Sequence, residues 1–197
     1  MCPPRVVTTP DEQDLVDLVA DVRAAKERSD AVVLSLHWGV HFVPRLIADY
    51  QKTVAQAAFA AGSDLILGHH AHVPKVIEVR GGKTCFYSLS NFIMSSEARV
   101  TGGAAEFQRN YGVPLDPEHP NMPYGMDAKR SLIAKAVISR DAIRTSFLPV
   151  IIDRQLRPEI LRASDPRFED MVRYMEWASE GFDHRFAVEG DEIAISG

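Results

Sequence analysis

The chain has 197 residues, of which 46% are hydrophobic and 25% charged, and its formal net charge at pH 7 is −5. This composition is typical of a globular protein with a sizeable core, and it argues against wholesale disorder and against a coiled coil. The acidic balance leaves no basic surplus to neutralise a phosphate backbone, so we expect no general nucleic-acid binding. Cys2 and Cys85 are too few for a disulfide framework or a thiolate zinc site.

Targeting segments are not evident in the sequence. Residues 1–10 lack the basic and apolar regions of a signal peptide, and no run approaches the ~18–20 apolar residues that a membrane-spanning helix needs. As written, the chain is expected to be cytoplasmic and to have no membrane segment. For a piece of a longer, exported protein, that expectation lapses.

The first predicted elements are a helix and a strand. Residues 11–28 predict an amphipathic helix with apolar side chains at helical spacing, capped by Thr9 or Asp11. Residues 31–36 (AVVLSL) form a continuous apolar run, which is typical of a strand buried on both faces. The run ends at His37, which a Trp-Gly pair follows.

The same order of elements then repeats. Residues 44–61 predict a helix that begins at Pro44 and ends at Gly62. Residues 64–67 predict a short strand, and residues 68–72 (GHHAH) follow it directly. Because ligands of α/β sheets bind at the carboxyl ends of the strands, both histidine groups lie where a site is expected.

The remaining elements follow from turn signals and periodicity. Residues 95–128, with four prolines, are the least regular part and predict a long loop or excursion. The other predictions are a hairpin over 75–79 and 83–88, strands over 131–138 and 143–152, a helix over 165–180 capped by Asp165, and a closing hairpin over 185–195. With no linker evident, we expect a single domain over 1–197.

Five of the seven histidines fall within 36 positions: His37, His41, His69, His70 and His72. Two imidazoles spaced as His-x-His on a loop can face one ion, and neutral imidazole is a usual ligand of zinc, iron and manganese. His70 and His72 have this spacing, and His37, at the end of the neighbouring strand, supplies a third nitrogen. We assign structural roles to His41, His119 and His184.

Three motifs, in this order, carry a family resemblance: residues 33–39 (VLSLHWG), 62–73 (GSDLILGHHAHV) and 86–92 (FYSLSNF). They resemble the CapA family of poly-gamma-glutamate capsule biosynthesis proteins, which are similar to calcineurin-like metallophosphoesterases. The resemblance runs from about residue 11 to the C-terminus and is strongest over 31–94. Two departures are Ser90, where the family usually has Gly, and His41, where many members have Glu.

The resemblance implies an α/β fold, a metallophosphoesterase-like sandwich of mixed β-sheets flanked by helices. It also implies divalent metal ions, two in the family's usual site, taken from Mn, Fe or Zn. The implied metal ligands are His37, His70, His72 and His69, of which His69 ranks last because its position is a Gly in the usual phosphoesterase motif. Trp38 and Asn91 are expected to shape a substrate pocket.

Part of the family's metal site has no counterpart in the chain. A complete phosphoesterase site also needs an Asp-x-His, a bridging Asp after Gly and an Asn, which in the family precede the part seen here. No Asp-x-His occurs, and the one Gly-Asp pair, Gly190-Asp191, falls in a predicted hairpin turn. The chain therefore resembles the C-terminal half of a CapA-like protein, with the N-terminal part lacking.

Three explanations remain open: a fragment of a longer protein, a short homologue that has lost catalysis, or a chain that borrows ligands from a partner. If catalytic, it is expected to hydrolyse a phosphoester in a small-molecule or polymer substrate with metal assistance. The alternative is a non-catalytic binding or scaffold component, or an inactive fragment. A half-sheet with an exposed edge would favour a homo-oligomer.

Overall fold

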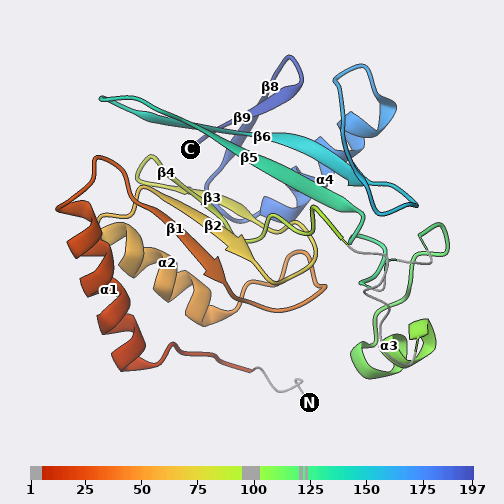
Figure 1. The fold of residues 1–197 in the computed structure, drawn as a ribbon, viewed down its shortest axis with the longest axis horizontal. Helices are drawn as coiled ribbons and strands as arrows, with labels where there is room; N and C mark the ends of the chain where they lie inside the picture. Colours follow the sequence, from red (N-terminus) through yellow and green to blue (C-terminus); the bar gives the residue numbers. More distant parts are fainter. Residues whose placement is uncertain (1–5, 95–102, 120–121, 123) are drawn as a thin grey trace.

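The computed structural model describes residues 6–94, 103–119, 122 and 124–197. Two β-sheets lie against each other, and helices cover the outer face of the first sheet (Figure 1). The first half of the chain forms α1 (Glu12–Lys26), β1 (Val33–His37), α2 (Asp49–Ala61), β2 (Leu65–His69), β3 (Ile77–Arg80) and β4 (Lys83–Phe86). The second half forms α3 (Gly103–Tyr111), β5 (Arg130–Ile138), β6 (Ile143–Ile152), β7 (Pro158–Ile160), α4 (Pro166–Ser179), β8 (Arg185–Glu189) and β9 (Glu192–Ser196).

The first sheet is mixed, with the order β1-β2-β4-β3. β1, β2 and β4 run parallel, whereas β3 is antiparallel to β4. The second sheet is antiparallel, with the order β5-β6-β9-β8, and β7 pairs with β6. Because β1 and β2 are parallel and in register, His37 and His69 are paired residues at the same edge of the sheet.

One core lies between the two sheets and α4. The first sheet contributes Leu65, Ile77 and Phe86, and the second contributes Leu132, Phe147 and Ile193. From α4 come Phe168, Met171 and Met175. The Oγ1 atoms of Thr84 and Thr145 lie 2.7 Å apart in this interior, so a buried hydrogen bond also joins β4 to β6.

A second core lies between the first sheet and α2, with α1 packed at its side. Ala55 and Ala58 of α2 are fully buried, and their small side chains let the helix approach the strands closely. Asp11 caps α1 by accepting hydrogen bonds from the amides of Gln13 and Asp14. Gly62 ends α2 in a left-handed conformation with φ of 119°, as predicted. The α/β fold with helix-flanked sheets is thus confirmed.

β1 differs from its prediction as a strand buried on both faces. Val33, Ser35 and His37 are exposed, whereas Leu34 and Leu36 are half-buried against the helices. β1 has one neighbour among the described strands, and the second sheet does not cover its outer residues. Burial of a strand is decided by what packs on it, which an apolar run does not reveal.

Two other boundaries also differ. α2 begins at Asp49 rather than near Pro44, because Ala48 is extended and its amide donates to the Gln51 side chain at 3.0 Å. The segment 95–128 is not a continuous loop, since residues 103–111 form α3. Its glycines and prolines dominated the sequence pattern, although they flank the helix rather than interrupt it.

Among the described residues, no helix is long and apolar enough to cross a bilayer.

Candidate functional site

The clustered histidines gather at the carboxyl ends of β1 and β2. His37 is the last residue of β1 and His69 the last of β2, and His70 and His72 follow in the next loop. Since paired residues on neighbouring strands point to the same face, the side chains of His37 and His69 leave the sheet together. The topology therefore brings both histidine motifs to one edge, as the sequence predicts.

Four of these imidazoles lie in ring contact. His70 Nδ1 is 2.8 Å from His37 Nε2, so the two side chains share one proton in a hydrogen bond. The ring of His41 lies 3.8 Å from that of His70 and 5.9 Å from that of His72, measured between centroids. His41, which the sequence assigned to a structural role, therefore belongs to the cluster. The only sequence signal for this was its position among five close histidines.

The backbone around the cluster is strained. Among described residues other than glycine, five have positive φ, and four of these lie at the site: Phe42, His70, His72 and Ser90. For His70 the value is 91°. Side chains disfavour this conformation by roughly 1–2 kcal/mol per residue, and such strain concentrates at functional sites.

His72 is held by two different contacts. Its Nδ1 lies 2.6 Å from the side-chain oxygen of Asn91, and its ring stacks on Tyr124 with centroids 4.0 Å apart and planes 11° from parallel. Asn91, predicted to shape a substrate pocket, is thus in direct contact with a predicted metal ligand. Tyr124 has no counterpart in the sequence prediction, because it comes from the segment regarded as an excursion.

Aromatic side chains from three segments surround His41 and His72. Phe42 follows His41, Phe107 and Tyr111 come from α3, and Tyr124 precedes β5. Tyr111 meets the ring of His41 edge-on at 6.5 Å, and Phe107 and Tyr111 both contact Phe42. α3 therefore packs onto the histidine cluster and forms one of its walls.

The surroundings favour neutral imidazoles. Burial lowers the pKa of His70, and the charges of His41, His37, His72 and Lys75 lower it further. Burial, His72, His37 and Lys75 act in the same way on the pKa of His41. Burial and His37 lower the pKa of His69. Among the described residues, no carboxylate contributes to these three shifts, so near neutral pH the three imidazoles offer uncharged nitrogens, the form that binds metal ions.

Lys75 is a buried cation close to the cluster. It has no exposed surface, and its Nζ donates to the Leu46 carbonyl oxygen at 2.6 Å. This bond fastens the loop that carries His41 and Phe42 to the segment that follows His72. Burial lowers the pKa of Lys75 to about 8.

Trp38 lies in the core. It is 6% exposed, it stacks on Tyr87, and its Nε1 donates to the Tyr87 carbonyl oxygen at 3.0 Å. The ring also lines a shallow apolar hollow with Leu15, Leu36 and Tyr50. Trp38 therefore packs in the core on the helix-covered side of the sheet. The histidine rings instead pack on one another at the carboxyl ends of β1 and β2.

The fit of a metal ion depends on the donor atoms. Among the described residues, one group of three or more His, Cys, Asp or Glu has ligand atoms all within 4.8 Å of one another: Asp116, Glu118 and His119. Lys129 Nζ already lies 2.8 Å from Asp116 Oδ2, so a cation there would meet a resident positive charge. The nitrogens of His37, His70 and His72 do not all lie within 4.8 Å of one another, so at least one of these side chains would have to move to bind a shared ion.

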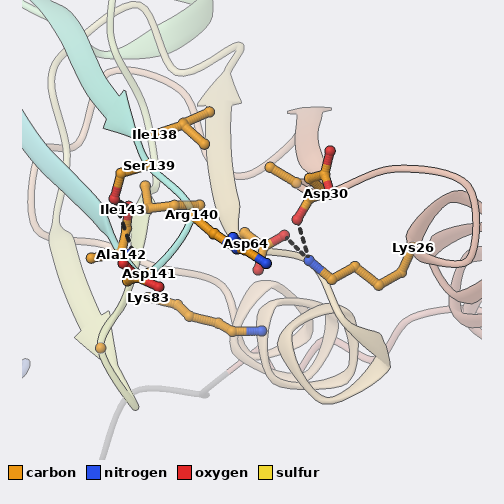
Figure 2. Close-up of a pocket in the computed structure, with 12 residues that line it drawn as sticks. Lys26, Asp30, Asp64, Lys83, Ile138, Ser139, Arg140, Asp141, Ala142 and Ile143 are labelled. Atoms are coloured by element: carbon orange, nitrogen blue, oxygen red, sulfur yellow. Dashed lines mark hydrogen bonds and ion pairs between the residues drawn. The ribbon is translucent and has the colours of Figure 1, made fainter.

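A cavity of about 740 Å³ lies at the opposite, amino end of the strands (Figure 2). It is lined by residues that precede β1 and β2 and by the β5–β6 turn. Lys26 Nζ pairs there with Asp64 Oδ2 at 2.7 Å and donates to the Asp30 carbonyl oxygen. Acidic and basic groups thus neutralise each other, and the cavity shares no residue with the histidine cluster.

Comparisons with known proteins match the part of the chain that carries the three motifs. Residues 4–96 match the family model described as "Bacterial capsule synthesis protein PGA_cap". The chain is similar to the PGA biosynthesis protein CapA of Bacillus subtilis (strain 168), with 43% identity over 72 residues, 36% of this chain and 19% of that protein. It is also similar to the Capsule biosynthesis protein CapA of Bacillus anthracis, with 38% identity over 68 residues, 34% of this chain and 16% of that protein.

A third relative matches over a longer segment. The Probable polyglutamine synthesis accessory protein Rv0574c of Mycobacterium tuberculosis (strain ATCC 25618 / H37Rv) is 29% identical over 109 residues, which are 52% of this chain and 27% of that protein. The matched segments thus cover between 16% and 27% of these three relatives.

Proposed function

Residues 4–96 belong to the bacterial capsule synthesis protein family, and on that premise we propose that the chain is a metal-binding component of poly-gamma-glutamate or capsule biosynthesis. The observation that carries the proposal is the meeting of His37, His41 and His70 at the carboxyl ends of two parallel strands. His72 joins them through His41.

The donor set favours one ion that prefers nitrogen ligands. Imidazole suits zinc, copper, iron and nickel best, whereas manganese, which the sequence also allowed, prefers oxygen ligands as magnesium does. The cluster offers four imidazoles, and no carboxylate of the part of the chain that the structure describes contributes to the pKa shifts of His41, His69 or His70. We therefore propose a single zinc-type ion held by His37, His70 and His72, with His41 as a fourth nitrogen. His69, the last residue of β2, ranks below these four as a ligand.

A carboxylate-bridged pair of ions does not fit the described residues. The family's two-ion site needs bridging oxygens, which the described residues near the cluster do not supply. A fragment, a shortened homologue or a borrowed ligand each accounts for this difference.

If the chain is catalytic, we propose metal-assisted hydrolysis of a phosphoester. A divalent ion supplies charge that polarises a phosphoryl oxygen and lowers the pKa of a bound water. The neutral imidazoles would hold that ion through unprotonated nitrogens. Asn91 would orient His72, and the buried ammonium of Lys75 would add positive potential beside the developing negative charge.

The metal site is tested by titrating the chelator-treated chain with Zn²⁺ and with Mn²⁺ in a calorimeter. We expect zinc to bind near one equivalent and more tightly than manganese. His70→Ala and His72→Ala should each weaken zinc binding at least tenfold. His184→Ala, whose imidazole is bonded to Glu176 and the Phe182 carbonyl, is the matched control. Equal zinc affinity in all three variants would refute the site.

Hydrolysis is tested separately with bis(p-nitrophenyl) phosphate and the zinc-loaded chain. Turnover that His70→Ala abolishes and His184→Ala preserves would support an enzyme. The missing bridging carboxylate favours a second candidate, a non-catalytic component that binds an anionic polymer through the metal. Zinc-dependent retention of poly-gamma-glutamate without any turnover would favour that candidate.

A further inference from the structure

The side chain of Asn91 is fixed by hydrogen bonds at both ends of its amide. Its Nδ2 donates to the His72 carbonyl oxygen at 3.2 Å and to the Ala128 carbonyl oxygen at 3.4 Å. Carbonyl oxygens accept only, so these two bonds determine which end of the amide is nitrogen. The amide oxygen is then the atom that faces His72 Nδ1, at 2.6 Å.

This orientation determines which nitrogen of His72 carries the proton. An amide oxygen has no proton to donate, so His72 Nδ1 must be the donor in the bond to Asn91. In the neutral imidazole the other nitrogen, Nε2, is then unprotonated and has a free lone pair. The imidazole is thus prepared to bind an ion or a proton through one particular atom.

Asn91 is itself anchored by the second sheet. Ser131, in β5, donates its hydroxyl to the Asn91 carbonyl oxygen, and Ala128 precedes the same strand. Stacking on Tyr124 fixes the plane of the His72 ring, while the bond from Nδ1 fixes its rotation. These two contacts therefore hold the His72 ring in one orientation. They do so at a residue whose backbone is in the left-handed region, with φ of 58°.

We propose that Asn91 is a positioning residue, whose amide holds His72 in the Nδ1–H tautomer and leaves Nε2 as its binding atom. The claim that His72 Nε2 binds a metal ion rests on the proposed function. The claim that Asn91 determines the tautomer of His72 does not. The two can therefore fail independently.

The tautomer is measured on the metal-free full chain by long-range ¹H–¹⁵N correlation spectra of ¹⁵N-labelled histidines. His72→Gln identifies the His72 signals by their loss. We expect the Nδ1–H pattern in the unaltered chain, and a shift toward the Nε2–H form in Asn91→Leu, which keeps the size but removes the acceptor. Ser139→Ala is the control, because it removes a serine hydroxyl that bonds to the Ala142 carbonyl oxygen in the β5–β6 turn, at the opposite end of the strands from the cluster.

Zinc affinity is the second readout. Loss of an outer partner of a metal-bound histidine costs roughly 10–100-fold in affinity, so Asn91→Leu should show that loss and Ser139→Ala should not. An Nε2–H pattern for His72 in the unaltered chain, or an unchanged tautomer in Asn91→Leu, would overturn the proposal. If Asn91→Leu does not fold, the tautomer of His72 in the unaltered chain is the measurement that decides. An unaltered chain that keeps the Nδ1–H tautomer but binds no zinc would overturn the proposed function and leave the role of Asn91 standing.

Discussion

The indole of Trp38 and the ring of Tyr87 lie parallel, 10° apart with centroids at 5.5 Å, and Trp38 Nε1 donates to the carbonyl oxygen of Tyr87. Gly68 lies against this pair. A Cβ atom at Gly68 would be 2.3 Å from the Tyr87 oxygen and 2.6 Å from Trp38 Nε1. The glycine before the His-His pair is thus required by the contact between Trp38 and Tyr87, the residues that follow β1 and β4, whatever the histidines bind.

Gly68→Ala should therefore destabilise the fold strongly. The new methyl group would break the Trp38–Tyr87 bond and overpack the core, and we expect a loss of about 3 kcal/mol in the free energy of unfolding. Urea denaturation measures it. Gly82→Ala is the control, since φ is positive there but the space is open, and it should cost about 1 kcal/mol. Equal losses would contradict the packing argument.

Ser90→Gly should stabilise the chain. Ser90 has φ of 74° and a buried hydroxyl without a hydrogen-bond partner. Relief of the left-handed strain, about 1–2 kcal/mol, exceeds the entropy that glycine adds to the unfolded chain, so we expect a net gain of about 1 kcal/mol. Thermal unfolding checks this. Ser90→Ala removes the hydroxyl but keeps the strain, and should gain less.

Lys75 makes the free energy of unfolding depend on pH in the alkaline range. Its pKa falls from 10.5 in an ordinary environment to about 8 in the folded chain. Between these values the unfolded chain binds the proton and the folded chain does not, so stability rises with pH. At about 1.4 kcal/mol per pKa unit, the contribution is on the order of 3 kcal/mol.

The measurement compares the unaltered chain with Lys75→Met at pH 7.5 and pH 10. We expect the free energy of unfolding of the unaltered chain to rise relative to the variant over this interval. Ionisation of tyrosines affects both chains equally, so it cancels when the two free energies of unfolding are subtracted. A constant difference would mean that Lys75 keeps an ordinary pKa after folding.

Asp116 also makes stability rise with pH, but in the acidic range. Lys129 and the Glu118 amide lower the pKa of its carboxyl group, despite burial. Its stabilising contribution is therefore present above the unfolded pKa and is lost as pH falls through the folded pKa. Asp116→Asn should cost about 1–3 kcal/mol at pH 7 and progressively less below about pH 4. Urea denaturation at both pH values tests this, and an effect independent of pH would contradict it.

Local signals in the sequence predicted most elements well. Asp11 and Asp165 cap their helices, Gly62 ends α2, and the two-glycine turn joins β3 to β4. These features depend on a few neighbouring residues, which is why sequence alone reveals them. The exposure of β1 depends on which layers cover it, and the extended segment before α2 is held at Leu46 by the distant Lys75. The local pattern reveals neither of these, so both predictions were wrong.

For the candidate site, the sequence predicted which residues meet but not how they are held. The strand–histidine order was enough to bring His37 and His70 together. The place of His41, the stacking of Tyr124 on His72 and the role of Asn91 depend on loops that fold back from far along the chain. Loop geometry of this kind has no periodicity to detect.

β1 is both the outermost strand of its sheet and the strand that ends at His37. Among the described strands, its outer backbone edge has no neighbour (Figure 1). A further strand that paired with it in parallel would end beside His37, in the same way that β2 ends at His69. A strand that paired in this way would deliver its own terminal side chain to the histidine cluster, so assembly at β1 and the chemistry of the site would be controlled together.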